Sequence, residues 1–267
     1  MGWIIVPAAL AALWLFLIAP GRASRAAKAP FAGRAYAHRG LYAPDQSVPE
    51  NSLPAFRRAM ENGYGAELDV QLTKDGRIVV FHDDSMQRAC GLEKAIRDFT
   101  YEELQGIPLF GTEARVPLFS DVLDIFGGRV PLIVELKYGP DWQALCAAVK
   151  TMLEEYDGPA CVESFHPAMV RWFWKHDPRR LRGQLSEAAC FSRKHVKGYL
   201  AFAMSRLLSN CLTRPQFIAY RVGPKPLSVR MAEAMGAMKV LWTAREPELH
   251  RQRMAENDAV IFEGYRP

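Results

Sequence analysis

The chain is poor in cysteine, and none of its cysteines is spaced like a disulfide framework or a thiolate metal site. The five cysteines among the 267 residues are Cys90, Cys146, Cys161, Cys190 and Cys211, and no Cys-x-x-Cys pair occurs. An odd number of widely spaced cysteines argues against a disulfide scaffold. We therefore expect reduced cysteines that pack mostly as small buried hydrophobic residues.

Long runs of one charge are also missing. The formal net charge is +5, and the densest basic cluster is Arg193-Lys194-His195 with Lys197. This mild excess gives no indication of a nucleic-acid partner, but it suits a phosphate-bearing substrate or an anionic membrane surface. The cluster follows a predicted strand, so it is either a solvated loop or a contact for anionic lipid. No obligate protein partner is indicated.

Residues 2–20 lack charged side chains altogether and are rich in leucine, isoleucine, alanine and tryptophan. As a helix they would span roughly 28 Å, close to the thickness of the hydrocarbon core of a bilayer. We therefore predict a transmembrane anchor over residues 1–20, with the membrane as a partner through residues 2–20. A linker over residues 21–33 follows.

Positive charges come only after this segment, at Arg22, Arg25 and Lys28. The positive-inside rule then places the remainder of the chain in the cytoplasm, as a single-pass membrane protein. A cleaved or outward-facing form is the alternative, because Gly21-Arg22-Ala23 is similar to a small-residue cleavage site.

From Arg34 onward, short β-rich runs alternate with helical patterns, which is typical of parallel strands joined by right-handed crossovers. At this length and 49% hydrophobic content, residues 34–267 fit one α/β domain, a TIM-type (β/α)8 barrel with a small hairpin insertion. The hairpin is Arg77–His82 after the turn signal Lys74-Asp75-Gly76. The eight predicted barrel strands are Ala35–Arg39, Gly65–Leu72, Val130–Lys137, Ala160–Phe165, Leu181–Ser186, Gln216–Val222, Lys239–Thr243 and Ala259–Phe262.

Helical patterns fill the spaces between these strands. Asn51 is a possible cap for the first of them, and Thr100-x-x-Glu103 is a capping box for a short helix. The predicted helices are Ser52–Asn62, Ser120–Phe126, Asp141–Glu155, Ala168–His176, Tyr199–Leu212, Ser228–Met235 and Pro247–Asn257.

Two histidines and an arginine lie where a barrel carries its chemistry, at the carboxyl ends of strands. His38 and Arg39 end the first strand, and His82 ends the hairpin partner. A pair of histidines can supply a proton acceptor and a proton donor. An arginine can bind phosphate oxygens with two parallel hydrogen bonds.

Carboxylates accompany them on neighbouring strands. Glu67 and Asp69 share one face of the second strand, because side chains alternate with a period of two. Glu135 and Lys137 share one face near the end of the next barrel strand. Clustered carboxylates are hard oxygen ligands for a divalent cation. Together these residues are the parts needed to cleave a phosphodiester with the help of a metal.

The motifs that contain these residues resemble those of the glycerophosphodiester phosphodiesterase family, over about residues 34–265. They are His38-Arg39-Gly40, Pro49-Glu50-Asn51-Ser52, Glu67-Leu68-Asp69 with the following Val70–Gly76, Val80-Phe81-His82-Asp83, Val134-Glu135-Leu136-Lys137, Glu163-Ser164-Phe165 and Leu241-Trp242-Thr243. The resemblance implies a TIM-type barrel that hydrolyses glycerophosphodiesters to glycerol 3-phosphate and an alcohol.

The resemblance also implies a role for each matching residue. Glu67, Asp69 and Glu135 would hold a divalent metal, Ca²⁺ or Mg²⁺; His38 and His82 would be the acid–base pair; Arg39 and Lys137 would contact the phosphate; and Glu50 would contact metal or substrate or organise the site. Trp242 either fills the core or lines the substrate site. Relatives often have Asn shortly after the Trp-Thr pair and Thr-Asp in the last strand, where this chain has Ala244-Arg245 and Glu263-Gly264, which leaves the identity of the substrate open.

Three alternatives therefore accompany a glycerophosphodiester substrate. One is a lysophospholipid cleaved on the head-group side, and another is the activity of a phosphoinositide-type phospholipase C, which has a similar barrel and paired histidines. The third is a catalytically silent, membrane-tethered module that binds phosphate.

Overall fold

A closed barrel of eight parallel strands forms the body of this computed structural model, which describes residues 2–188 and 197–267. The strands follow one another around the barrel in the order β1-β9-β8-β7-β6-β5-β4-β2, and pairing of β1 with β2 closes it. The short β3 lies outside the barrel, antiparallel to β2. The strands are β1 (Arg34–His38), β2 (Gly65–Leu72), β3 (Ile78–Val80), β4 (Leu132–Leu136), β5 (Ala160–Ser164), β6 (Arg182–Ser186), β7 (Phe217–Arg221), β8 (Met238–Ala244) and β9 (Ala259–Phe262). The predicted barrel and its hairpin are confirmed.

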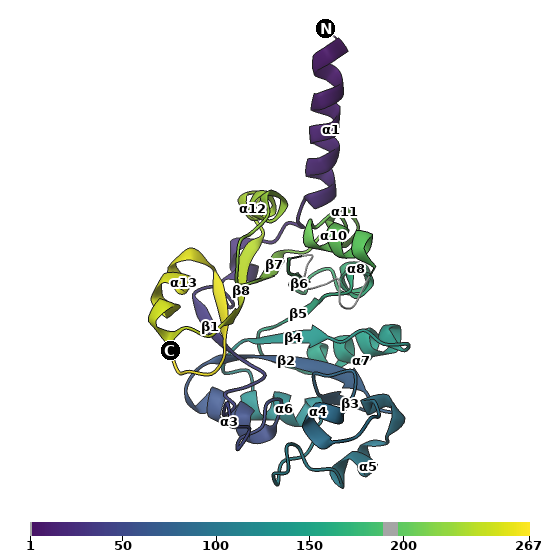
Figure 1. Cartoon of the computed structure of the whole chain (residues 1–267), viewed down its shortest axis with the longest axis vertical. Helices are drawn as coiled ribbons and strands as arrows, with labels where there is room; N and C mark the ends of the chain where they lie inside the picture. Colours follow the sequence, from purple (N-terminus) through teal and green to yellow (C-terminus); the bar gives the residue numbers. More distant parts are fainter. Residues whose placement is uncertain (1, 189–196) are drawn as a thin grey trace.

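Helices lie around the strands, and the N-terminal helix projects away from the barrel (Figure 1). They are α1 (Gly2–Ile18), α2 (Arg25–Lys28), α3 (Leu53–Glu61), α4 (Gln87–Cys90), α5 (Tyr101–Gln105), α6 (Phe119–Phe126), α7 (Trp142–Glu155), α8 (Pro167–His176), α10 (Gly198–Ser205), α11 (Asn210–Thr213), α12 (Leu227–Ala234) and α13 (His250–Glu256), with the 3-10 turns η1 (Ile96–Asp98) and η2 (Pro247–Leu249). The single helix predicted over Tyr199–Leu212 is two, α10 and α11, separated where Leu207 has a φ of 57°.

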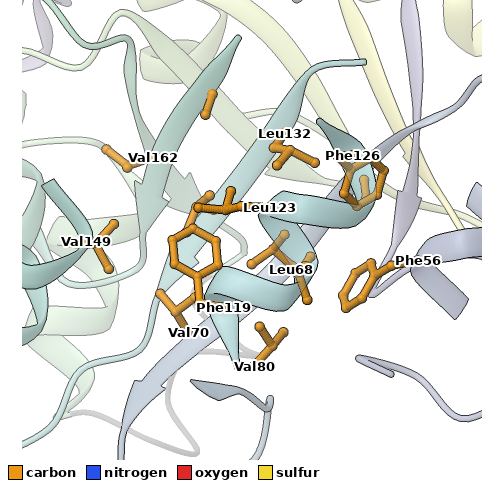
Figure 2. Packing of buried hydrophobic residues seen from close by; sticks show 14 of the residues in the cluster. Phe56, Leu68, Val70, Val80, Phe119, Leu123, Phe126, Leu132, Val149 and Val162 are labelled. Carbon is orange, nitrogen blue, oxygen red and sulfur yellow. The ribbon is translucent and has the colours of Figure 1, made fainter. Parts of the chain in front are cut away.

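The main apolar core lies between the outer surface of the barrel strands and the helices that cover it. Figure 2 shows the rings of Phe56 on α3 and of Phe119 and Phe126 on α6 beside Leu68 of β2. The rings of Phe56 and Phe126 meet edge to face, with centroids 6.0 Å apart. Because β2 is buried on this face as well as toward the barrel interior, a charged side chain on it needs partners.

Residues 83–118 form a small layer between β3 and α6, with an apolar cluster of its own around Met86, Ile96 and Leu104. Thr100 and Glu103 form the predicted capping box of α5. This layer brings α4 to the mouth of the barrel, so the hairpin insertion contributes to the site as well as to the fold.

The prediction of a single-pass membrane protein is wrong. Helix α1 has 17 residues, with Pro7 inside it, and would span about 26 Å at 1.5 Å per residue. Across the described ranges, no helix is long and apolar enough to cross a membrane. The apolar run continues to Pro20, but the helix stops earlier. Its last carbonyl groups are held by the protein, since Asn210 donates to Ile18 O and Arg214 to Ala19 O, at 2.9 and 3.1 Å.

The cysteine prediction is confirmed in part for the residues that are described, since two of the four thiols are buried and Cys90 and Cys211 are half-buried. Cys90, Cys146, Cys161 and Cys211 are free thiols, with Cys146 and Cys161 fully buried, while Cys190 lies outside the described residues. Most of the basic cluster, Arg193 to His195, lies outside them too, so its predicted contact with anionic lipid stays a prediction.

Candidate active site

A cavity of about 560 Å³ opens among the carboxyl ends of the barrel strands. One side of it is polar and the other is apolar. The polar lining residues are His38, Arg39, Glu67, His82, Asp83, Asp84, Glu135, Lys137, Glu163, Ser164 and Glu187, and the others are Leu136, Tyr138, Phe165, His166, Leu185, Met204, Trp242 and Ile261. The predicted site residues thus meet in one place, apart from Asp69 and Glu50, which lie directly behind the lining.

A row of carboxylates crosses three adjacent strands because the strands pair in register. Asp69 of β2 lies opposite Glu135 of β4, which lies opposite Glu163 of β5. Carboxylate oxygens of Glu67, Asp69 and Glu135 all lie within 4.8 Å of one another, and all three residues are buried. Three buried oxygen donors at this spacing can hold a divalent cation.

Crowding of these acids raises the proton affinity of some of them. Burial, reinforced by the charges of Asp69 and Glu135, holds the pKa of Glu67 well above its usual value. Burial also raises the pKa of Glu135, although Lys137 opposes the shift. A bound cation would relieve this repulsion, so the donor set fits a divalent metal.

Two cations lie against Asp69. Lys137 Nζ is 3.3 Å from Asp69 Oδ1 and 2.9 Å from Glu135 Oε1, and Arg39 Nε is 3.6 Å from Asp69 Oδ2. Burial works against ionisation of Asp69, but Lys137 and Arg39 outweigh it and lower the pKa of this carboxyl. Both cations also line the cavity, where they can contact an anionic substrate.

The loop after β1 directs Arg39 into the site through two unusual backbone positions. Arg39 has a φ of 56° and Gly40 a φ of 82°. A Cβ at Gly40 would lie 2.9 Å from the backbone of Ala55, so glycine is required there both by conformation and by space. The loop is closed by the amide of Asn51, which donates to Arg39 O at 2.8 Å.

Asn51 does not cap the following helix as predicted. Ser52 is the cap of α3, and its Oγ accepts from Ala55 N. Asn51 instead has a φ of 52° and turns its side chain to the barrel, where Nδ2 donates to Asp69 Oδ2 at 2.8 Å. A residue expected to have a local role therefore orients a carboxylate of the site.

Each of the two histidines contacts a carboxylate through Nδ1. His38 Nδ1 lies in close contact with Glu263 Oε2, and His82 Nδ1 is 2.6 Å from Asp83 Oδ1. Burial and the neighbouring Arg39 lower the pKa of His38. Since a carboxylate accepts hydrogen bonds, both rings direct Nε2 away from it; for His38, Nε2 lies 3.8 Å from Glu67 Oε2.

Glu50 lies between two guanidinium groups. Arg39 Nη1 and Arg88 Nη2 are 2.7 and 2.6 Å from Glu50 Oε1, and Arg88 also donates to Oε2. Burial opposes ionisation of Glu50, but these cations lower its pKa. Its oxygens are not in the group formed by Glu67, Asp69 and Glu135.

The apolar side of the cavity is formed by residues of β6, β8 and α10 and of the loops that follow β4 and β5. Trp242 lies edge-on to Phe165 with ring centroids 5.6 Å apart, and its Nε1 donates to Ala219 O at 3.0 Å. His166, which carries no sequence motif, stacks on Tyr138 at 3.7 Å. Leu185 and Met204 complete this wall.

Sequence patterns missed several residues of the site. Glu163 had a detectable signal, since it is the fourth residue of β5 as Glu135 is of β4, each an acid within a buried strand. Arg88 is six residues beyond His82, on a helix of one turn with no periodicity to reveal its direction. Arg245 and Glu263 were noted only as departures from a family pattern.

Comparison with known proteins agrees with this architecture. The model of the glycerophosphoryl diester phosphodiesterase family matches residues 38–264. A glycerophosphodiester phosphodiesterase of Caldanaerobacter subterraneus is 42% identical over 111 residues, covering 39% of this chain and 44% of that protein. A lysophospholipase D of Rattus norvegicus is 28% identical over 156 residues, covering 54% of this chain and 48% of that protein. The chain thus spans about half the length of each of these two relatives.

A solved structure shares the fold. It is an Oleispira antarctica phosphodiesterase in complex with the product sn-glycerol-3-phosphate, with a TM-score of 0.70 at 21% identity, covering 88% of this chain and 94% of that one. At that identity the likeness concerns the fold alone.

Proposed function

Because this chain belongs to the glycerophosphoryl diester phosphodiesterase family, we propose that it is a phosphoric diester hydrolase that converts glycerophosphodiesters to glycerol 3-phosphate and an alcohol. The observation that carries the proposal is the meeting of His38, His82, Glu67 and Glu135 at one cavity, with Asp69 directly behind its lining and within 4.8 Å of the other two carboxylates. A module that only binds phosphate would need the cations but not two histidines, each with a carboxylate partner.

Glu67, Asp69 and Glu135 would hold the divalent metal, Ca²⁺ or Mg²⁺, since hard oxygen donors suit both ions. When bound, the metal would supply Lewis-acid stabilisation of a phosphoryl oxygen and lower the pKa of an adjacent hydroxyl group. Glu50 has both oxygens engaged by Arg39 and Arg88, so its proposed role is to orient Arg39.

Arg39 and Lys137 would bind the non-bridging phosphate oxygens and stabilise the charge that develops in the transition state. One histidine would take a proton from a water molecule as the water oxygen adds to phosphorus. The other would give a proton to the alkoxide as the phosphorus–oxygen bond to the alcohol breaks. The proton count balances, and each step needs an Nε2 that faces the cavity.

The apolar wall of Phe165, Leu185, Met204 and Trp242 extends the proposed range of substrates to lysophospholipids. A cavity of this volume is larger than a glycerol phosphate requires. An acyl chain on the glycerol would lie against these side chains, which would otherwise face water. In both substrates the same phosphorus–oxygen bond, on the head-group side, would break.

Choline release from glycerophosphocholine and from lysophosphatidylcholine tests the proposal, with Ca²⁺, with Mg²⁺ and with EDTA. We expect release that depends on the metal, and ³¹P spectra that identify glycerol 3-phosphate and lysophosphatidate as products. The variants His38→Ala and His82→Ala should each lose about 10²–10⁴-fold in kcat.

His176→Ala is the matched control, since this histidine stacks on Trp172 outside the cavity and should turn over normally. No release from either substrate by folded protein that binds the metal would contradict the proposal. Near-normal kcat in either cavity variant would remove that histidine from the acid–base pair.

A further inference from the structure

Arg245 and Glu263, which follow the last two strands, form a chain of polar contacts that ends at His38. Glu263 follows β9, and its Oε2 is the contact of His38 Nδ1. Arg245 follows β8, and its Nε and Nη2 both lie 2.5 Å from Glu263 Oε1. The two strand ends are joined by a backbone hydrogen bond from Glu263 N to Ala244 O of 3.0 Å.

The chemistry of these contacts fixes the proton on the ring. An ionised carboxylate can only accept, so His38 Nδ1 carries the hydrogen and Nε2 presents a lone pair. Glu263 is ionised, because burial is outweighed by the contacts with His38 and Arg245, which lower its pKa to about 2. The side chain of Glu263 is 10% exposed, so this carboxylate is screened little by water.

We propose that Glu263 and Arg245 act together as positioning residues for His38: Glu263 holds the ring in the tautomer whose Nε2 faces the cavity, and Arg245 holds Glu263 in place. The inference rests on the proposed role of His38 as an acid–base group. An arginine suits this role, since its five donors in a planar fork can bind the free edge of a glutamate.

The second histidine has the same arrangement, which supports a functional reason for it. Asp83 contacts His82 Nδ1, and Arg88 Nε is 2.7 Å from the other oxygen of Asp83. In each case an arginine holds the carboxylate that contacts the ring. A purely structural ion pair would have no reason to recur at both histidines of one cavity.

Substitution of Glu263 and Arg245 tests the inference. In Glu263→Gln the amide can donate to Nδ1 and favour the wrong tautomer, so kcat should fall about 10²-fold while KM changes less than about twofold. Glu263→Asp should recover part of the loss because the charge returns. Arg245→Gln should have a smaller effect, and the double variant Arg245→Gln with Glu263→Gln should be no slower than Glu263→Gln alone.

Glu233→Gln is the matched control. Glu233 forms an equally short ion pair, 2.5 Å from Lys225 Nζ, but lies outside the cavity, so its loss should leave kcat unchanged. Equal kcat in Glu263→Gln and the wild type, or strictly multiplicative effects of Arg245→Gln and Glu263→Gln, would overturn the inference. If Glu263→Gln does not fold, Arg245→Gln carries the same comparison.

A readout independent of turnover separates this inference from the proposed function. In protein labelled with ¹⁵N-histidine, the ring signals of His38, identified by their loss in His38→Ala, should report the Nδ1–H tautomer and should shift toward Nε2–H in Glu263→Gln. If His38→Ala turns over normally, the acid–base role fails whatever the spectra show. If His38→Ala is inactive but Glu263→Gln has native spectra and native kcat, only the positioning role fails.

Discussion

Arg88 binds both carboxylate oxygens of Glu50, at 3.0 and 2.6 Å, across 38 residues of sequence. The same guanidinium binds Asp83, the partner of His82. One side chain from the insertion after β3 therefore connects the loop that orients Arg39 with the carboxylate that orients His82. Glu50 is buried and Arg88 is half exposed, so the buried carboxylate holds the more exposed guanidinium group in position.

Arg88→Ala should lower kcat about 10-fold to 100-fold, because Glu50 and Asp83 both lose a partner. Arg88→Lys should retain part of the activity, since an ammonium is a point charge and cannot bridge two carboxylates as a guanidinium can. Steady-state kinetics on glycerophosphocholine measures both. Arg57→Ala, on the exposed face of α3, is the control and should behave like wild type. Equal kcat in Arg88→Ala and Arg57→Ala would show that the bridge has no catalytic importance.

Removing any one of the three clustered carboxylates should weaken metal binding. Glu67→Gln, Asp69→Asn and Glu135→Gln each delete an anionic ligand, so calorimetric affinity for Ca²⁺ or Mg²⁺ should fall about 100-fold or more. The exposed Glu113→Gln is the control and should bind as the wild type does. Unchanged affinity in all three variants would place the metal elsewhere.

Glu163 should make the metal-free protein less stable as the pH rises. Burial and the charges of Glu135 and Asp69 hold its pKa well above the usual value, and its Oε2 is buried without a hydrogen-bond partner. The folded state therefore keeps a proton that the unfolded state releases above about pH 4.3, so stability falls from there up to the raised pKa.

Glu163→Gln removes this dependence. In EDTA its melting temperature should exceed that of the wild type at pH 8, by about 2–4 °C for each kcal/mol recovered, and the difference should shrink toward pH 4. Thermal unfolding at the two pH values measures it. A variant less stable than the wild type at pH 8 would mean that the ionised carboxylate has a favourable partner in the folded protein.

Gly65 should be sensitive to a single added methyl group. A Cβ at Gly65 would lie 2.6 Å from the ring of Tyr36 and 2.7 Å from Pro131 O, both buried where β1, β2 and β4 meet. Gly65→Ala should therefore lower the free energy of unfolding by about 1–3 kcal/mol, measured in urea. Gly139→Ala is the control, because an added Cβ there meets nothing within 4 Å.

The N-terminal segment shows where composition misleads. Residues 2–20 are uniformly apolar, and hydropathy alone predicts a span. Where the helix ends depends on contacts that hydropathy does not contain: Asn210 and Arg214, about 190 residues away, hold the carbonyl groups of Ile18 and Ala19. The same reasoning applies to Asn51. Its side chain could cap the following helix or bind Asp69 of β2, and its backbone, with a φ of 52°, directs it to Asp69.

Sequence by itself determined the barrel, because the spacing of apolar residues is a local property of the chain. Apolar residues recur with a period of two within strands and of 3.6 within helices. It also brought His38, His82, Glu67, Asp69 and Glu135 to one end, since parallel strands share their polarity. Tertiary structure alone decided which groups orient them. Glu263 reaches His38 across 225 residues and Arg88 reaches Glu50 across 38, and such pairs depend on barrel closure and loop direction. No local pattern encodes them, because each pair joins residues that are distant in sequence and meet only in the folded barrel.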